Sequence, residues 1–302
     1  QMCQDLHAAG AIDYLGRGFD TRISLPPSQS RRESTCTECG NCIDICPTGA
    51  MYYVGSEGAG REWEFESVPT ICPYCGCGCT IILNVRDNRV AQITAHPDLG
   101  INKGLLCVKG RFGIDFVSHE ERLTTPLIRR DGKLTPATWD QALDLVAQRL
   151  STIKNQFGPD AIAGLASAKC TNEENYLMQR FMRVVIGNNN IDGCARVCHA
   201  PTAFGMQQSF GTGAATNSIA EIYEADCLLV IGANSTESHP VTGAKMQQRA
   251  MKGVPLIVID PRRIELTRYA TVHLQLRPGP NVALLDMLIY YVITEGLGDE
   301  EF

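Results

Sequence analysis

The chain has 302 residues, of which 44% are hydrophobic and 20% are charged, a composition typical of a globular protein with two or three domains. Its formal net charge of -6 and the lack of a long basic run argue against a nucleic-acid-binding protein. No apolar run reaches the ~20 residues that a transmembrane helix needs, and the longest candidate, 282–294, contains Asp286 and is predicted to be a buried helix.

The cysteine content is high for a chain of this size. The sequence has 14 cysteines, a density that accompanies either a disulfide framework or bound metal. Disulfide-rich domains are typically small and secreted, whereas most of these cysteines stand in two tight groups ahead of a long α/β pattern. The arrangement therefore favours metal binding in a reducing or anaerobic setting.

The first group of cysteines lies within residues 1–66, which we predict to be a small ferredoxin-like iron–sulfur domain. Its members form a C-x2-C-x2-C-x3-C-P run made of Cys36, Cys39, Cys42 and Cys46. A [4Fe–4S] cluster needs four convergent thiolates, and two-residue gaps allow one tight loop to supply three of them. Gly40 leaves room for the backbone to approach the sulfides. Structural zinc also uses four ligands, but rarely at this spacing.

The fourth cysteine of this run indicates a second cluster. In two-cluster ferredoxins, the last Cys of such a run ligates the other cluster. By that geometry Cys3 serves the cluster of the first three cysteines, whereas Cys46 belongs to a cluster whose other ligands precede Gln1. We therefore expect the natural N-terminus to lie upstream. The alternative is that Cys3 is a free thiol and the four clustered cysteines share one site.

Residues 67–125 are predicted to form a second cluster-binding module of α+β type. The alternating segments 80–86 and 89–94 indicate a hairpin with Asp87 and Asn88 in its turn. The module also contains a C-x2-C-x3-C-x27-C pattern, which suits one further [4Fe–4S] cluster. Its predicted ligands are Cys72, Cys75, Cys79 and Cys107. Cys77 alternates with these ligands and is expected to point away from them, although ligand exchange stays open.

Residues 126–302 are predicted to be an α/β region with a doubly wound parallel sheet, because strand and helix patterns alternate. Thr138 and Gln141 form a capping-box pattern that opens a helix to about residue 154. The predicted strands are 161–165, 226–231, 255–259 and 272–276. The other predicted helices are 172–186, 242–251 and 281–295. Ligands bind such sheets at the C-terminal ends of the strands.

The second group of cysteines resembles the motif of a known enzyme family. Cys72-Pro-Tyr-Cys75-Gly-Cys-Gly-Cys79, with a distant Cys107-Val-Lys109-Gly, is similar to the start of the molybdopterin-bis(guanine dinucleotide) oxidoreductases. Within that family it resembles the catalytic, or alpha, subunits of formate dehydrogenases. The resemblance spans essentially the whole chain. It implies that Lys109 lies between the cluster and a pterin on the electron route, rather than being a solvated surface residue.

A third motif has the position expected of the active site. The segment Cys194-Ala-Arg-Val-Cys198-His199-Ala-Pro201 resembles the family signature R-V-(Sec/Cys)-H-x-P. The resemblance implies that Cys198 binds molybdenum or tungsten and that His199 faces the substrate. A soft thiolate suits such a metal, and a histidine can take up a proton. Alone, a Cys-His pair is more typical of a buried cysteine beside a helix-capping histidine.

Loops that follow the predicted strands resemble the cofactor-contact loops of the family. Small residues and backbone N–H groups after strand 226–231 suit a pyrophosphate. Asp260 matches the paired N–H donors of guanine, and Arg262 offsets phosphate charge. The predicted contacts of the pterin dinucleotide are Thr216, Asn217, Gly232, Asn234, Ser235, Glu237, His239, Asp260, Arg262, Gly279 and Asn281. His239 is expected to position the cofactor rather than to ligate the metal.

The resemblance implies oxidation of formate to CO2, or the reverse, at molybdenum or tungsten held by bis-molybdopterin guanine dinucleotide. Electrons would leave past Lys109 through two to three [4Fe–4S] clusters to a partner subunit. That partner is expected to be an iron–sulfur or flavoprotein subunit that reduces NAD(P), a ferredoxin or a hydrogenase. Cys at position 198 in place of Sec implies slower chemistry. Family members continue for several hundred residues more, so we expect this chain alone to be catalytically incomplete.

The sequence also leaves open two other functions and the cellular location. A pterin-free scaffold, related to the large iron–sulfur subunit of NADH dehydrogenases, has no need for Cys198, His199, Lys109 or Asp260. Nitrate reductases share the Cys ligand but lack the following His and the ferredoxin-like run. No signal peptide is evident, which favours the cytoplasm, but the expected upstream sequence leaves room for an export signal.

Overall fold

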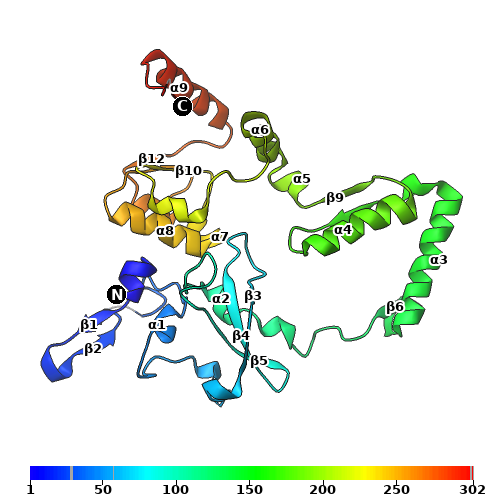
Figure 1. Ribbon diagram of the computed structural model, residues 1–302, viewed down its shortest axis with the longest axis horizontal. Coiled ribbons are helices and arrows are strands. Elements are labelled where there is room, and N and C mark those ends of the chain that lie inside the picture. Colours follow the sequence, from blue (N-terminus) through cyan, green and yellow to red (C-terminus); the bar gives the residue numbers. More distant parts are fainter. Residues whose placement is uncertain (28–29, 57, 300, 302) are drawn as a thin grey trace. The chain divides into compact units, whose positions relative to one another are not determined.

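The computed structural model describes residues 1–27, 30–56, 58–299 and 301. The chain divides into two compact units, one made of 1–114 with 218–302 and the other of 115–217 (Figure 1). Each unit has its own hydrophobic core. The helices and strands are described below unit by unit.

The beginning of the first unit consists of short elements joined by long loops, as expected of a segment organised around bound clusters. Strands β1 and β2 pair antiparallel. The elements are η1 (Met2–Leu6), β1 (Asp13–Leu15), η2 (Gly18–Asp20), β2 (Arg22–Ser24), α1 (Asn41–Asp44), η3 (Val54–Ser56) and η4 (Glu62–Glu64).

A three-stranded antiparallel sheet follows, made of β3 (Glu66–Ile71), β4 (Thr80–Arg86) and β5 (Arg89–Thr94). The predicted hairpin over 80–94 is confirmed. Asp87 and Asn88 both have positive φ, 51° and 57°, as a two-residue type I′ turn requires. Ile81, which is 1% exposed, packs with the cysteine-bearing loop, so this sheet packs against the loop. The short helix α2 (Val108–Phe112) begins directly after Cys107.

The parallel sheet of the first unit has the order β10 (Leu228–Ile231), β11 (Leu256–Ile259) and β12 (Val272–Leu274). The predicted parallel α/β architecture is therefore confirmed. Helix α8 (Pro240–Met251) connects β10 to β11 and packs on the sheet through Met246 and Ala250 (Figure 1). Shorter elements complete this part, namely η8 (Ile219–Tyr223), α7 (Ser235–Ser238) and η9 (Glu265–Arg268).

Helix α9 (Asn281–Thr294) differs from its prediction. It forms where expected, but none of its residues is buried, and side chains such as Tyr290 and Ile293 are well exposed. The prediction that it is a buried helix is therefore wrong, because no element among the described residues covers it. No helix in the described part of the chain combines the length and apolarity needed to cross a lipid bilayer.

The second unit contains an antiparallel hairpin, a short parallel pair and several helices. Thr138 and Gln141 form the predicted capping box, with the Gln141 amide 3.3 Å from Thr138 Oγ1. Thr171 caps the next helix, α4. The elements are η5 (Asp115–Val117), β6 (Leu127–Arg130), β7 (Lys133–Pro136), α3 (Trp139–Phe157), η6 (Pro159–Ala161), β8 (Gly164–Ala166), α4 (Asn172–Arg180), η7 (Phe181–Ile186), β9 (Ile191–Gly193), α5 (Ala195–Cys198) and α6 (Ala200–Phe210).

Candidate functional site

Four of the predicted ligands surround one small cavity, which we call the inner cysteine cavity. It is lined by Cys72, Cys75, Cys77, Cys79 and Cys107, together with apolar groups from the neighbouring loop and from α8. The Cys72 amide donates to the Cys79 carbonyl over 2.9 Å, which closes the loop on itself. Burial raises the pKa of the Cys72 and Cys75 thiols. Thiolates in this cavity therefore need a compensating positive centre.

The residues of the inner cysteine cavity fit a [4Fe–4S] cluster. A Cβ at Gly110 would lie 3.6 Å from Cys72 Sγ, so glycine leaves space beside the sulfur. Among the described residues, no three His, Cys, Asp or Glu side chains converge on a point where they could hold a single metal ion. A cubane cluster is bound by four soft thiolates, and the cysteines around this cavity supply donors of that kind.

Cys77 does not point away from the ligands as expected. It is 5% exposed, it lines the inner cysteine cavity, and its Sγ lies 3.2 Å from Thr242 Oγ1 on α8. Gly78 has φ of +65°, so the chain turns between the two flanking cysteines and the alternation of an extended strand does not apply. A hydrogen bond with Cys79 lowers the pKa of Cys77 to about 5.

Asn102 fixes the two ends of this ligand set relative to each other. Its side chain is fully buried. The carboxamide accepts from the Thr80 amide at 2.8 Å and donates to the Thr80 and Leu105 carbonyls at 3.1 and 2.9 Å. Thr80 follows the ligand Cys79, and Leu105 lies two residues before Cys107. One side chain therefore satisfies three backbone groups and sets the distance between two ligand-bearing segments.

The outer cysteines, Cys3, Cys36, Cys39 and Cys42, also lie close to one another. Burial and the nearby thiolates of Cys39, Cys3 and Cys36 all raise the pKa of Cys42. Cys3 lies on η1, and its Sγ accepts from the Ala11 amide at 3.2 Å. This proximity agrees with the interpretation in which Cys3 completes the set of four. The assignment of the ligands stays a prediction.

Cys46 has a different environment from the other cysteines of its run. Its Sγ lies 3.5 Å from Thr48 Oγ1, and hydrogen bonding to Thr48 lowers the pKa of the thiol to about 7. Cys46 lines a pocket together with Cys3 and Cys42. Such a thiol is ready to bind metal near neutral pH.

A buried polar network joins the outer cysteine loop to the inner one. Asn41, which is 1% exposed, accepts from the Leu106 amide and donates to the Leu106 carbonyl, each over 3.0 Å. The Arg111 guanidinium donates to Asn41 Oδ1 at 2.9 Å and to the Cys39 carbonyl at 2.8 Å, and pairs with Asp44 at 2.6 Å. Asn41 precedes Cys42 and Leu106 precedes Cys107. A single carboxamide therefore links neighbours of two predicted ligands.

Gly40 lies directly against the Arg111 side chain. We expect Gly40→Ala to destabilise the first unit by about 2–4 kcal/mol. Gly40 has φ of +71°, and an added Cβ would lie 2.3 Å from Arg111 Cδ, whose side chain is held by three partners. Urea unfolding measures the change.

Gly49→Ala is the matched control for Gly40→Ala. Gly49 has a similar φ of +69° but no atom within 4 Å of the added Cβ. It should therefore show only the conformational cost, about 1–2 kcal/mol. Equal losses of stability in the two variants would contradict a steric role for Arg111.

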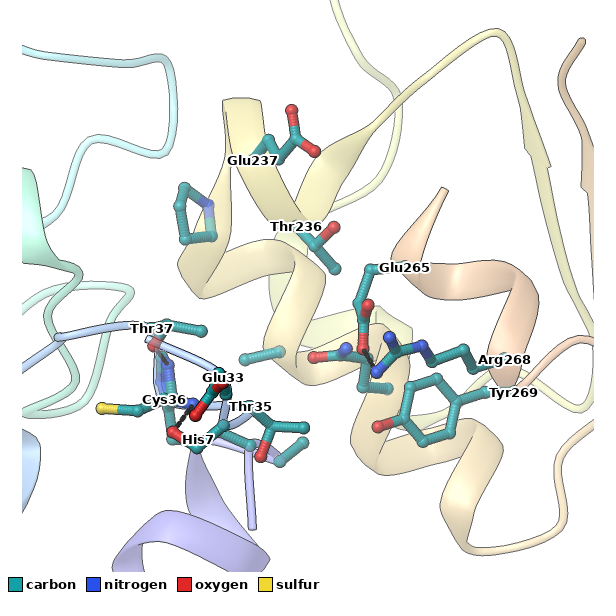
Figure 2. A pocket seen from close by; sticks show the side chains of 16 residues that line it. His7, Glu33, Thr35, Cys36, Thr37, Thr236, Glu237, Glu265, Arg268 and Tyr269 are labelled. Carbon is teal, nitrogen blue, oxygen red and sulfur yellow. Dashed lines mark hydrogen bonds and ion pairs between the residues drawn. The ribbon is translucent and has the colours of Figure 1, made fainter. Parts of the chain in front are cut away.

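A separate pocket of about 340 Å³ lies beside the outer cysteines. Figure 2 shows His7, Cys36 and Thr37 on one side and Glu265, Arg268 and Tyr269 on the other, with the Cys36 sulfur directed away from the Arg268 side. His7 Nε2 lies 2.6 Å from Thr37 Oγ1, and burial lowers the pKa of His7.

The predicted cofactor residues of the first unit follow the C-terminal ends of the parallel strands. They come after β10 (Gly232, Asn234, Ser235, Glu237 and His239), after β11 (Asp260 and Arg262) and after β12 (Gly279 and Asn281). Asp260 is 4% exposed and accepts from the Arg262 amide at 2.8 Å. A Cβ at Gly76 would lie 3.9 Å from His239 Nε2, so His239 stands beside the inner cysteine loop. This edge fits a dinucleotide, whose phosphates and base need backbone N–H groups and a carboxylate.

The remaining predicted residues have other surroundings. Lys109 is half-buried on α2, and its ammonium opposes the effect of burial on the pKa of Cys72. In the second unit, Cys198 ends α5 and His199 caps α6, and both side chains are exposed. Thr216 Oγ1 donates to Asn217 Oδ1 at 2.9 Å on the surface of the same unit. The roles of Cys198 and His199 therefore stay predictions.

Known families match three consecutive segments. Residues 31–52 match "4Fe-4S binding domain", residues 65–119 match "Molybdopterin oxidoreductase Fe4S4 domain", and residues 122–301 match "Molybdopterin oxidoreductase". The solved structure of acetylene hydratase from Pelobacter acetylenicus is similar with a TM-score of 0.63 at 26% identity, over 77% of this chain and 32% of that one.

Similar proteins include the F420-dependent formate dehydrogenase subunit alpha of Methanocaldococcus jannaschii, 45% identical over 79% of this chain and 35% of the relative. Formate dehydrogenase H of Escherichia coli is 45% identical over 78% of this chain and 34% of its own length. The probable oxidoreductase YjgC of Bacillus subtilis is 33% identical over 100% of this chain and 35% of its length. The chain thus spans about a third of the length of these relatives.

Proposed function

The chain belongs to the molybdopterin oxidoreductase family, and on that premise we propose that it is part of the catalytic subunit of a formate dehydrogenase. The observation that carries this proposal is the 45% identity to two relatives that are formate dehydrogenases, over more than three quarters of the chain. The four cysteines around the inner cavity and the Cys198-His199 pair support it. The proposed division into domains is 1–66, 67–125 and 126–302.

The proposed reaction is the oxidation of formate to CO2, which releases two electrons and one proton. Molybdenum or tungsten with two molybdopterin guanine dinucleotides would supply the redox chemistry when bound. Cys198 would hold the metal through its thiolate. His199, its neighbour in sequence, takes up the proton. Asp260 would bind the guanine, and Gly232, Ser235 and Arg262 would hold the phosphates through backbone N–H groups and charge.

The proposed exit route for electrons passes along the cysteine loops. Lys109 lies beside the inner cluster, which Cys72, Cys75, Cys79 and Cys107 hold. From there the Asn41 carboxamide offers a short bonded route, because it joins Leu106, next to Cys107, to the segment that carries Cys42. The outer cysteine loop would hold the clusters that face a partner subunit, for which a flavoprotein, a ferredoxin or a hydrogenase is proposed.

Cofactor analysis of the full-length protein, purified anaerobically, tests the function, with formate-dependent reduction of benzyl viologen as the assay. We expect iron, pterin, and either molybdenum or tungsten, and dye reduction that requires formate. Iron without metal or pterin would contradict the proposal and favour an electron-conducting scaffold. That second candidate rests on the cluster motifs alone and leaves Cys198 and Asp260 without a role.

A further inference from the structure

Lys245 is a buried cation that the proposed reaction does not use. It lies on α8 and is 4% exposed. Its Nζ donates to the Ile101 carbonyl at 2.9 Å and lies 5.6 Å from the centroid of the Tyr223 ring. Within the described residues, no carboxylate comes within ion-pair distance of this ammonium. Burial lowers the pKa of Lys245, as expected for a cation without a matching anion.

Lys245 projects from the face of α8 that borders the inner cysteine cavity. Val241 lines that cavity, and Thr242 contacts Cys77 at 3.2 Å. Residues three and four positions apart share one face of a helix, so Lys245 lies one turn along from both. The negative charges of Cys79 and Cys77 act on Lys245 and oppose the effect of burial on its pKa. The ammonium is therefore within electrostatic range of the inner sulfurs.

An unpaired buried ammonium is costly unless an opposite charge compensates for it. A cluster held by four thiolates is such a charge, and it is what the adjoining cavity fits. We propose that Lys245 is the counter-cation of the inner cluster and raises its reduction potential. This proposal rests on the assignment of that cluster to Cys72, Cys75, Cys79 and Cys107, which the proposed function includes.

The charge of Lys245 is expected to raise the reduction potential of the inner cluster rather than to lower it. Reduction adds one electron to the cluster and forms or breaks no bond, so the reduced cluster is more negative than the oxidised one. A fixed positive charge stabilises the reduced form more and makes the cluster a better electron acceptor. Lys245 is a positioning residue in this scheme, because it acts on the cluster through space and through the Ile101 loop, and touches no substrate.

The test is the midpoint potential of the inner cluster in the anaerobically purified protein, titrated with dithionite and followed by EPR. The inner signal is the one that disappears in Cys107→Ala. Lys245→Met keeps the length of the side chain and removes its charge. We expect its reduction equilibrium to fall about tenfold, which is about 59 mV for a one-electron couple. Lys245→Gln is a second neutral variant, and Lys245→Arg should keep the potential of the unmodified protein.

Lys252→Met is the matched control, because Lys252 caps the same helix but is exposed. It should leave the potential unchanged. The proposal is overturned if Lys245→Met and Lys252→Met have the same potential, or if Lys245→Arg shifts as far as the neutral variants. Loss of the cluster in both neutral variants but not in Lys245→Arg would support it. Absence of formate oxidation with an intact inner cluster would count against the proposed function and leave this titration unaffected.

Discussion

Replacing Cys198 with alanine is expected to reduce formate-dependent viologen reduction by at least about 10³-fold, the scale seen when a group at a reacting centre is removed. The thiolate is proposed to bind the metal, and alanine offers no ligand in its place. Cys198 is exposed at the end of α5, so its loss leaves no cavity in the core. The iron content and the free energy of unfolding should therefore stay unchanged.

Cys194→Ala is the matched control for this experiment. Cys194 is the N-cap of the same short helix and is also exposed. Its Sγ accepts a hydrogen bond from the Ala168 amide at 3.4 Å, and no metal is proposed to bind it. We expect activity close to that of the unmodified protein. Full activity of Cys198→Ala with pterin still bound would disprove the proposed role of Cys198.

Local patterns sufficed to predict much of the fold. The hairpin of β4 and β5 was predictable because its strands alternate and Asp87-Asn88 is a sequence that accepts positive φ. The capping box at Thr138 and the parallel strands β10 and β11 follow from similarly local signals. The candidate ligands were also predictable, because iron–sulfur chemistry imposes fixed spacings on cysteines that lie close in sequence.

Residues that contact partners far away in the sequence were not predicted. Asn41 meets Leu106, 65 residues away, and Lys245 meets Ile101, 144 residues away. Asparagine and lysine are common in loops and on helix surfaces, so their types give no hint of burial. The one available signal was position, because Asn41 precedes a predicted ligand. The prediction that Cys77 points away from the ligands is wrong for a related reason, because residue spacing does not reveal the positive φ at Gly78.

Asn102 is the strongest example of such a residue, and Asn102→Ala is expected to cost about 3 kcal/mol or more and to abolish the inner cluster. The substitution leaves the Thr80 amide and the Thr80 and Leu105 carbonyls without partners in the interior. It also releases the loop that carries Cys107 from the strand that follows Cys79. Urea unfolding, iron and sulfide analysis, and the inner EPR signal measure these effects.

Asn84→Ala is the matched control for Asn102→Ala. It removes a buried carboxamide that does not anchor the Cys107 loop. Asn84 is 8% exposed on β4, but it bonds to the hydroxyls of Ser67 and Thr94, which can rotate toward other partners. We expect a cost of about 1 kcal/mol and a normal inner cluster. If Asn102→Ala retained the cluster, or if both variants lost it, Asn102 would not be the residue that fixes the inner ligands. Loss of the inner cluster in Asn102→Ala but not in Asn84→Ala would show that a residue that does not bind the metal determines whether the cluster forms.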